Sequence, residues 1–472
     1  MRKTKIVCTI GPASESLEVV RQLVRQGMNV ARLNFSHGTL EEHLARLQNV
    51  REASRLEGRS VGVLLDIQGP KIRTGPMAAG PVELVTGQPI VVVPELIPGT
   101  TERMGIGYEK LPASVTEGSP ILIDDGMVEL RVEKVVGQEV HCRVVVGGKI
   151  SARKGVSLPG VAVDLPPLGE RDVEHLRFGV EHDVDFIAAS FVRRGEHVEF
   201  IKETIAQLGG DIPVIAKIES DEGVRNIHEI IDAADGVMVA RGDLGVQIPP
   251  EEVPLVQKQI IHLCNVAGKP VIIATQMLES MVRHARPTRA EVTDVAQAIF
   301  DGTDAVMLSG ETAVGRYPAE AVSMMSRIAS RVEKSLDYEK NLEMKRDFAR
   351  TSVAEAISHA TCEASLDLDL KAIISSTQSG STARMVSKYR PRCPIIAVTP
   401  SEKVCRQLTL TWGVLPVVVP RTEHIDDMID IGDQAALASG LVQIGDLTAI
   451  TAGVKTGLPG STNMLQIHEI TG

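Results

Sequence analysis

Three residues carry the clearest chemical signal in this sequence. Lys217 and Glu219 stand two positions apart in PVIAKIE, and Asp243 lies in the next β-branched segment, DGVMVARGD. Side chains two positions apart on a strand share one face, so this ammonium and this carboxylate are predicted to point the same way. Two carboxylates with waters suit a hard cation such as Mg²⁺ or Mn²⁺, and a lysine beside them could neutralise a phosphoryl group in transfer. The alternative is that both acids are solvated side chains or helix N-caps.

Polar residues also end other β-branched segments. ARLNFSHG supplies a cation, an amide, a hydroxyl and an imidazole, which could hold a phosphate and a monovalent ion: Arg32, Asn34, Ser36 and His37. Ser36 could equally be a helix N-cap, and His37 is favoured as a structural residue or nucleotide contact rather than a base. Thr275 in IIATQMLESM could relay a proton through water or cap the next helix.

The segment ARGDLG, which contains Asp243, also leaves backbone uncovered. Gly242 and Gly245 carry no side chain, and free amides entering a turn can bind a carboxylate or a phosphate. Taken alone, GDLG could be a mere tight turn.

These residues share one position in the sequence pattern. Eight short β-branched runs, each followed by a helical pattern, are KTKIVCTI, NVARLNF, VGVLLDI, VDFIAAS, PVIAKIE, DGVMVARGD, PVIIATQ and DAVMLSGE. This pattern predicts a (β/α)₈ TIM barrel, in which the C-terminal ends of the strands line the active site. The polar residues at those ends are Arg32, Asn34, Ser36, Asp66, Ser190, Lys217, Glu219, Arg241, Asp243, Thr275, Ser309 and Glu311.

The spacing of the runs predicts two further domains. About 120 residues separate Asp66 from Asp185, far more than one βα connection needs. Short strand-like runs between Gly, Pro and Asp turns predict an inserted all-β lid there, a β-barrel module over residues 70–167. The barrel would comprise residues 1–69 and 168–338. Strands alternating with helices then predict a C-terminal open α/β regulatory domain over residues 339–472.

Composition excludes several classes of function. A net charge of −11 argues against a nucleic-acid or membrane-surface partner. No apolar stretch approaches the roughly 20 residues that span a bilayer, and the N-terminus turns straight into a strand, so a cytoplasmic location is expected. Six widely spaced cysteines without a CxxC pair suit reduced packing thiols. Because no GxxxxGK[ST] motif occurs, any nucleotide is not held by a P-loop.

Taken in order, the segments resemble the pyruvate kinase family from residue 3 to the C-terminus. The resembling motifs are KTKIVCTIGPAS, ARLNFSHG, LLDIQGPKIRTG, KGVSLPG, AASFVR, IAKIESDEGV, VMVARGDLGV, AGKPVIIATQMLESM, RPTRAEVTDVAQAIFDGTDAVMLSGETAVGRYP and SKYRPRCPIIAVTP. The resemblance implies the glycolytic transfer of a phosphoryl group from phosphoenolpyruvate to ADP, giving pyruvate and ATP. It also implies a homotetramer, and the end of the chain soon after TNMLQIHEI implies that the extra phosphohistidine-type domain of some relatives is absent.

The resemblance also implies roles for single residues. Glu219 and Asp243 would hold the divalent cation, while Lys217 would stabilise the phosphoryl group in flight. Arg32 would clamp that group from another side. The substrate carboxylate would be held by the amides of Gly242 and Asp243 and the hydroxyl of Thr275. Thr275 would also lie on the path that protonates C3 of enolpyruvate.

Two further sets of positions follow from the resemblance. Those facing the nucleotide and its metal would be Asn34, His37, Arg73 and Lys154, the last two brought in by lid closure. Those of a monovalent ion would be Asn34, Ser36, Asp66 and Ile67. Glu42 stands where many relatives place a tyrosine, which puts nucleotide contacts there in doubt.

Lys71 is an informative departure from the family pattern. Most potassium-activated members carry Thr-Lys after the strand-three aspartate and a glutamate after GP, whereas this chain reads DIQGPK over residues 66–71. A fixed ammonium at Lys71 could supply the charge that K⁺ otherwise supplies. We therefore predict that K⁺ is not required and that the ion positions can stay vacant. The alternative is that Lys71 is a solvated hinge residue.

A loop of the C-terminal domain could bind an anion. STQSGSTAR follows the strand-like run KAIISS and opens a helix, so a sugar phosphate or a nucleotide monophosphate could dock on Thr377, Gln378, Ser379, Gly380, Ser381 and Thr382. The alternative is a Ser/Thr-capped helix that senses nothing. Relatives use this loop for effectors, but Gln378 stands where some of them carry a lysine.

Two other functions compete with a kinase. A lyase or mutase barrel acting on phosphoenolpyruvate or pyruvate would explain the metal-binding acids, but not the lid with Arg73 and Lys154. A silent phosphosugar-binding scaffold on the same fold would be expected to have lost Lys217, Glu219, Asp243 or Thr275, and all four are present.

Overall fold

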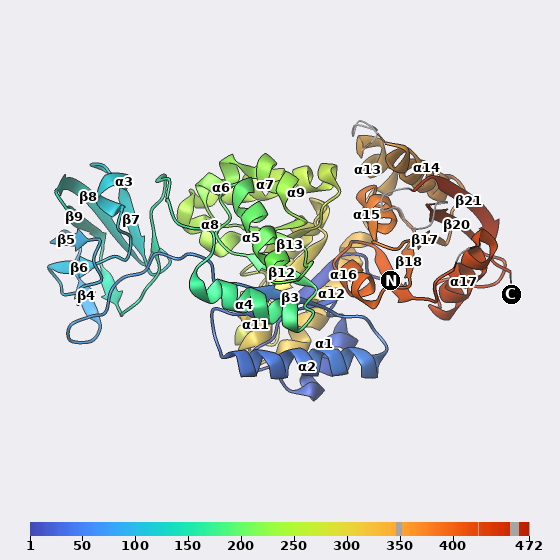
Figure 1. Cartoon of the computed structure of the whole chain (residues 1–472), viewed down its shortest axis with the longest axis horizontal. Helices are drawn as coiled ribbons and strands as arrows, with labels where there is room; N and C mark the ends of the chain where they lie inside the picture. Colours follow the sequence, from blue (N-terminus) through green and yellow to red (C-terminus); the bar gives the residue numbers. More distant parts are fainter. Residues whose placement is uncertain (346–351, 423, 454–461, 472) are drawn as a thin grey trace.

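The computed structural model describes residues 1–345, 352–422, 424–453 and 462–471. Figure 1 shows three bodies in a row, with a β-rich lid at one end, a barrel in the middle and an α/β domain at the other end. The fold class predicted from the sequence is confirmed.

The central body is a closed barrel of eight parallel strands, in the order β1-β16-β15-β14-β13-β12-β3-β2. Each strand lies within one of the eight predicted runs, and nearly every strand residue is buried because helices cover the outside. The strands are β1 (Lys5–Thr9), β2 (Val30–Asn34), β3 (Gly62–Asp66), β12 (Phe186–Ala189), β13 (Val214–Ile218), β14 (Gly236–Ala240), β15 (Val271–Ala274) and β16 (Ala305–Leu308).

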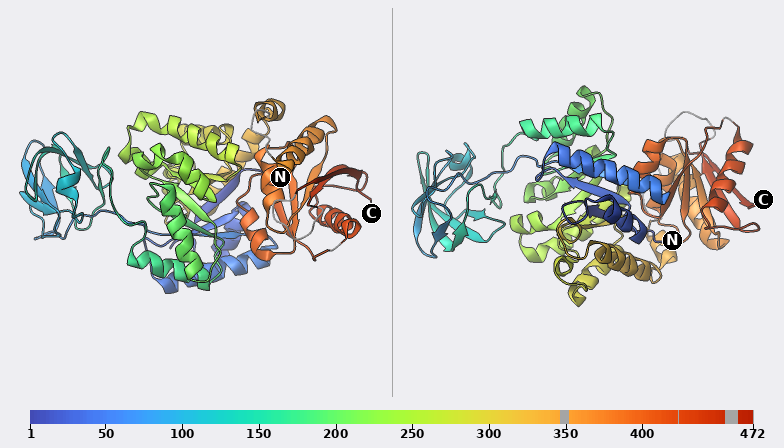
Figure 2. Two further views of the ribbon diagram at one scale, coloured as in Figure 1. Left: turned by 45° about the horizontal axis from the view of Figure 1, so that its top comes forward. Right: turned by 90° about the horizontal axis from the view of Figure 1, so that it is seen from below.

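Helices of two kinds surround the strands, as the two views of Figure 2 show. The outer helices are α1 (Leu17–Gln26), α2 (Leu40–Glu57), α4 (Glu170–Glu181), α5 (Gly195–Gln207), α7 (Ile227–Ala233), α9 (Val253–Ala267), α10 (Arg289–Phe300) and α12 (Pro318–Glu333). Short helices occupy the connections: α6 (Asp221–Arg225), α8 (Arg241–Gln247), α11 (Gly310–Ala313), η1 (Pro250–Glu252) and η2 (Glu279–Val282).

The start of α2 corrects one expectation. Its N-cap is Thr39 and not Ser36, because Thr39 is extended and its Oγ1 accepts the N–H of Glu42 at 3.3 Å. Glu42 in turn accepts the N–H of Thr39 at 3.2 Å, which completes a capping box. Ser36 lies outside the helix and is exposed.

The lid has its own sheets and its own apolar core. Its elements are β4 (Val82–Leu84), β5 (Pro89–Val93), β6 (Arg103–Gly105), α3 (Leu111–Ser114), β7 (Pro120–Ile123), β8 (Val128–Val136), β9 (Glu139–Val146), β10 (Gly148–Ile150) and β11 (Val156–Ser157). They form a six-stranded sheet, β11-β7-β8-β9-β5-β6, and a separate pair, β10-β4, where the sequence predicted a β-barrel. Extended segments join this body to the barrel (Figure 1).

The C-terminal domain is an open sheet in the order β19-β18-β17-β20-β21, with only β21 antiparallel. Its elements are α13 (Tyr338–Met344), α14 (Val353–Asp367), β17 (Ala372–Ser376), α15 (Ser381–Lys388), β18 (Ile395–Thr399), α16 (Glu402–Leu408), β19 (Val414–Val418), α17 (Ile425–Ala438), β20 (Leu447–Ala452) and β21 (Met464–Glu469). The domain docks on the barrel end opposite the lid, where Leu410 joins the apolar cluster of the barrel interior.

Two general expectations concern membranes and thiols. Across the residues that the structure describes, no helix is both long and apolar enough to cross a bilayer. All six cysteines lie in the described ranges, and all are free and buried, as the sequence predicted.

Candidate active site

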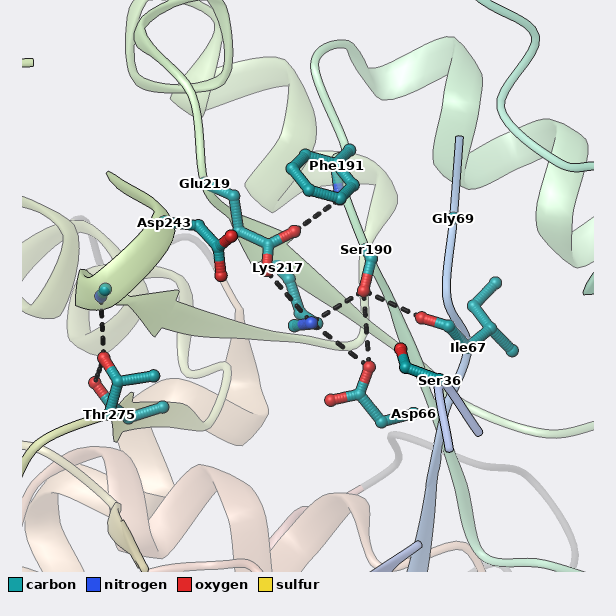
Figure 3. A network of polar contacts seen from close by, with 12 residues as sticks. Ser36, Asp66, Ile67, Gly69, Ser190, Phe191, Lys217, Glu219, Asp243 and Thr275 are labelled. Carbon is teal, nitrogen blue, oxygen red and sulfur yellow. Dashed lines mark hydrogen bonds and ion pairs between the residues drawn. The ribbon is translucent and has the colours of Figure 1, made fainter. Parts of the chain in front are cut away.

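Lys217 is the centre of the polar network at the lid-facing rim of the barrel (Figure 3). Its Nζ lies 3.1 Å from Asp66 Oδ1, 2.6 Å from Ser190 Oγ and 3.0 Å from Glu219 Oε1. An ammonium has three hydrogens, so these three acceptors satisfy it completely. The side chain of Lys217 is only 10% exposed. Its three partners lie at or next to the ends of β3, β12 and β13, which places the ammonium at the rim.

The charges of this network are set by burial and by one another. Burial lowers the pKa of Lys217, but Asp66 and Glu219 outweigh burial and raise it overall, so the lysine is charged at neutral pH. Burial raises the pKa of Asp66, but Lys217 and Arg32 together bring it below its usual range. Glu219 keeps a raised pKa because burial, with repulsion from Asp243, exceeds the attraction of Lys217.

Arg32 approaches the same carboxylate from the other side. Its Nε lies 2.7 Å from Asp66 Oδ2, and its Nη1 donates to Thr9 Oγ1 at 2.9 Å. Two cations thus share one buried acid, which fixes their positions relative to each other. The structure therefore brings together Arg32 and Lys217, the two cations predicted to meet a phosphoryl group.

Glu219 and Asp243 provide the oxygen donors of the rim. Both line a cleft between the barrel and the lid hinge. Glu219 accepts the N–H of Phe191 at 2.7 Å, and Phe191 takes a left-handed φ of 55° to make this bond. Within the described ranges, no three His, Cys, Asp or Glu side chains converge as metal ligands. Two carboxylates in mutual repulsion nonetheless fit a hard divalent cation that takes its other ligands from substrate and water.

Thr275 follows β15 and meets the start of α8. Its Oγ1 accepts the N–H of Gly242 at 2.8 Å and donates to the carbonyl of Ala274 at 2.6 Å. The sequence predicted a free amide at Gly242. In the structure this amide donates to the Thr275 hydroxyl instead. The helix-capping alternative for Thr275 is wrong, because η2 begins only at Glu279 and its N-cap is Leu278.

Comparisons with known proteins agree with this geometry. The model of the pyruvate kinase barrel domain matches residues 1–322, and that of the pyruvate kinase alpha/beta domain matches residues 355–468. The chain belongs to the pyruvate kinase family. Its relatives include the pyruvate kinases of Geobacillus stearothermophilus, at 52% identity, and Sporosarcina psychrophila, at 51%. Each match spans 100% of this chain and 81% of the relative. A solved pyruvate kinase from Cryptosporidium parvum superposes with a TM-score of 0.96 at 41% identity, over 100% of this chain and 96% of that one.

Lys71 is the residue predicted from the sequence to replace K⁺. Its Nζ lies 3.5 Å from Asp243 Oδ1 and 5.7 Å from the centroid of the Phe191 ring. The ammonium is therefore placed at the carboxylate end of the cleft, and its side chain is 27% exposed. Lys71 lies in the segment that joins β3 to the lid, so its role as a replacement for K⁺ and its role as a hinge residue both stay predictions.

The predicted monovalent-ion positions lie around the ends of β2 and β3. Asn34 Oδ1 accepts the N–H of Ser36 at 3.2 Å, and the carbonyl of Ile67 accepts the hydroxyl of Ser190 at 2.8 Å. Asp66 is engaged by Arg32 and Lys217, so its charge is already neutralised by protein cations.

The predicted nucleotide positions form two groups. Asn34 and His37 lie on the loop between β2 and α2, where the N–H of His37 donates to the carbonyl of Asn34 at 3.3 Å. Arg73 and Lys154 lie on the two segments of the lid hinge, which pair through an isolated bridge between Arg73 and Gly155. Lys154 Nζ is 3.0 Å from Asp124 Oδ1, and Arg73 donates to the carbonyl of Arg153 at 3.2 Å.

The predicted effector loop joins β17 to α15. The N-cap of α15 is Gly380 at φ 81°, without a side-chain capping bond, so the Ser/Thr-capped alternative does not describe this helix. Thr382 Oγ1 lies 2.8 Å from Thr462 Oγ1, and the carbonyl of Ser379 accepts a bond from Arg384 at 2.7 Å. Thr377 and Gln378 precede Ser379 in the loop, and Ser381 is the first residue of α15.

Sequence reasoning assigned no role to three residues that shape the rim. Thr9 holds Arg32, Ser190 bridges Lys217 to Asp66 and Ile67, and the amide of Phe191 holds Glu219. Ser190 had a signal, since it ends the fourth predicted run. Thr9 stands one position before the end of the first run, but a threonine there is also ordinary strand composition. The left-handed turn at Phe191 leaves no pattern in the sequence.

Proposed function

We propose that this chain transfers the phosphoryl group of phosphoenolpyruvate to ADP in a reaction that depends on a divalent cation. The bond between phosphorus and the enol oxygen breaks, and an oxygen of the ADP β-phosphate forms the new bond to phosphorus. The enolate that remains takes a proton at C3 and becomes pyruvate. The observation that carries this proposal is the buried, charged Lys217 held between Asp66, Ser190 and Glu219 at the rim of a family barrel.

Lys217 and Arg32 would neutralise the phosphoryl group during transfer. Asp66 fixes both cations in advance, so little reorganisation is needed when charge develops on the group. Phosphoryl transfer depends mainly on positioning and charge neutralisation, which is what this pair supplies.

Glu219 and Asp243 would hold Mg²⁺, or Mn²⁺ in its place. When bound, the cation supplies positive charge to the substrate oxygens that complete its coordination. The hydrogen bond from the amide of Phe191 orients Glu219 for this task. Lys217 would then exchange one contact with Glu219 for one with the phosphoryl group.

Thr275 would act at the other end of the substrate. Its hydroxyl, with the amides of Gly242 and Asp243, would hold the carboxylate, and it would lie on the path of the proton to C3. The bond between Gly242 and Thr275 shows that this amide and hydroxyl meet at one point, where a carboxylate would replace their mutual contact.

The nucleotide would bind between the barrel rim and the lid. Asn34 and His37 would contact it from the barrel, and closure of the lid would bring Arg73 and Lys154. The extended hinge segments seen in Figure 1 suit such a movement, because they cross to the lid without a helix that would have to break.

Lys71 would replace K⁺. Its ammonium stands 3.5 Å from Asp243, beside the cation site, and Asp66 already has two protein cations. The positions Asn34, Ser36, Asp66 and Ile67 would then need no monovalent ion.

The proposal has further features, which rest on the resemblance and on the spacing of the sequence. The enzyme would work in glycolysis in the cytoplasm as a homotetramer, with domain boundaries at residues 70, 168 and 339. A sugar phosphate or nucleotide monophosphate would activate it from the loop of residues 377–382, whose backbone opens α15.

The decisive experiment measures pyruvate formation from phosphoenolpyruvate, with and without ADP, Mg²⁺ and K⁺. It compares the unaltered chain with Lys217→Met and with Lys5→Met, a control that removes another buried barrel lysine at the opposite end. We expect ADP-dependent and Mg²⁺-dependent turnover without K⁺, a fall of about 10³-fold in Lys217→Met and little change in Lys5→Met. Consumption of phosphoenolpyruvate without ADP, to a product other than pyruvate, would favour a lyase or mutase, and no turnover under any condition would favour a scaffold.

A further inference from the structure

Two neighbouring residues beside the rim have unusual backbone geometry. Thr275 has φ 71° and Gln276 has φ 54°, both in the left-handed region. For a β-branched residue such as threonine this conformation is a genuine outlier, because the side chain crowds its own backbone. Such a conformation persists only where the surroundings determine it, so the contacts of this turn indicate what it is for.

Arg241 holds the backbone on both sides of Thr275. Its Nη2 donates to the carbonyl of Thr275 at 2.8 Å, and its Nε faces the carbonyl of Ala274 at 3.3 Å. These two carbonyls belong to the two peptide planes that flank Thr275. Because the angle between those planes sets φ and ψ, one guanidinium restrains the whole conformation of the threonine.

Asp294 holds the guanidinium in turn. Its Oδ1 lies 2.6 Å from Nη1 of Arg241 and its Oδ2 lies 2.7 Å from Nη2, a two-pronged ion pair. Arg241 is 14% exposed and begins α8, whereas Asp294 lies on α10. Planar, paired bonds of this kind fix orientation as well as distance.

The consequence of this arrangement is the direction of the Thr275 hydroxyl. In its left-handed conformation Oγ1 reaches the amide of Gly242 at the start of α8 (Figure 3). An extended backbone at Thr275 would send the side chain elsewhere. We propose that Arg241 and Asp294 are positioning residues that hold Thr275 in this strained conformation, so that its hydroxyl serves the proton transfer at C3. This inference rests on the proposed role of Thr275.

The test isolates proton transfer from phosphoryl transfer. By microscopic reversibility, a site that protonates C3 of enolpyruvate also exchanges the C3 hydrogens of pyruvate with solvent. Exchange into D₂O is followed by NMR with pyruvate, Mg²⁺ and inorganic phosphate, and KM for ADP is measured in the full reaction. The variants are Asp294→Asn and Arg241→Lys, which keep size or charge but lose the two-pronged pair.

We expect both variants to lose about tenfold to a hundredfold in exchange rate, with KM for ADP within about twofold of the unaltered chain. Gln276→Gly added to Asp294→Asn should recover several-fold, because glycine takes positive φ without strain and Gln276 is exposed. Loss without recovery would point to general damage and overturn the inference. Unchanged exchange in both variants would also overturn it.

Two further variants separate the inference from the proposed function. Glu57→Gln breaks another two-pronged arginine pair, that with Arg25, on helices far from the rim, and should leave exchange unchanged. Thr275→Val removes the hydroxyl itself. If Thr275→Val keeps full exchange, the proposed role of Thr275 is wrong. If Thr275→Val loses exchange while Asp294→Asn and Arg241→Lys keep it, only the positioning role is wrong.

Discussion

At the rim of the barrel, one buried acid holds two cations in place. Asp66 is 1% exposed and pairs with both Arg32 and Lys217. Burial raises its pKa, but the two cations outweigh burial, so the folded-state pKa lies below the unfolded value near 4. The stabilisation that the ionised carboxylate provides is therefore complete above about pH 4 and is lost as the pH falls through the folded-state pKa.

The predicted result is a pH-dependent difference in thermal stability. We expect the unaltered chain to melt at a higher temperature than Asp66→Asn by a margin that is constant from about pH 7 to about pH 5. Below about pH 4 the margin should shrink, because protonation then removes from the unaltered chain the charge that the variant already lacks. Scanning fluorimetry across this range measures it, and a margin independent of pH would contradict the prediction.

Lys71 offers a second prediction for a single residue. Lys71→Glu would place two carboxylates together at the cleft, since Asp243 lies 3.5 Å from the ammonium in the unaltered chain. We expect turnover without K⁺ to fall by about a hundredfold and to return largely when K⁺ is added, because a monovalent cation can then be held there. Lys110→Glu, an exposed lysine of the lid, is the control for charge alone. K⁺-independent turnover in Lys71→Glu would argue against the replacement.

Among the elements, α2 links helix stability to the predicted nucleotide site. Its capping box at Thr39 and Glu42 begins two residues after His37. Thr39→Ala should destabilise the start of the helix by about 1 kcal/mol and raise KM for ADP more than KM for phosphoenolpyruvate. Ser401→Ala removes the N-cap of α16 in the C-terminal domain and should leave both constants unchanged. Equal rises in both constants in Thr39→Ala would show that the effect is not local.

The same helix shows why the sequence predicted the elements better than the site. Short β-branched runs, each followed by a helical pattern, located all eight barrel strands, because burial on both faces leaves nearly continuous apolar runs. The sequence marked Glu42 only as the position where many relatives carry a tyrosine. In the structure Glu42 caps α2, and this role depends on its pairing with Thr39. Similarly, strand ends pointed to Lys217 and Glu219, whereas Asp294 lies 53 positions from Arg241 and no local pattern connects them. Left-handed turns at Phe191 and Thr275 depend on such distant contacts.

For the whole molecule, the junction between barrel and C-terminal domain rests on buried ion pairs. Arg390 pairs with Asp304 through two bonds of 2.9 and 3.0 Å, and both side chains are 8% exposed. Asp304 precedes β16, and its Oδ2 also accepts the N–H of Val271 at 3.1 Å. The pair therefore connects the end of the barrel opposite the lid to the segment that follows α15. Arg406 adds a second link, 2.7 Å from the fully buried Asp185.

Breaking this junction should uncouple the two domains. Arg390→Met leaves Asp304 buried without its cation, which costs about 3–5 kcal/mol. We expect calorimetry to show one coincident unfolding transition in the unaltered chain and a separate, earlier transition in the variant. Lys371→Met, which breaks an exposed pair with Asp369, should have little effect. Arg390→Met combined with Asp304→Leu removes both charges and should recover much of the loss, because the penalty comes from the unpaired acid. If the double variant is as unstable as the single one, packing around Arg390 and not its charge holds the domains together.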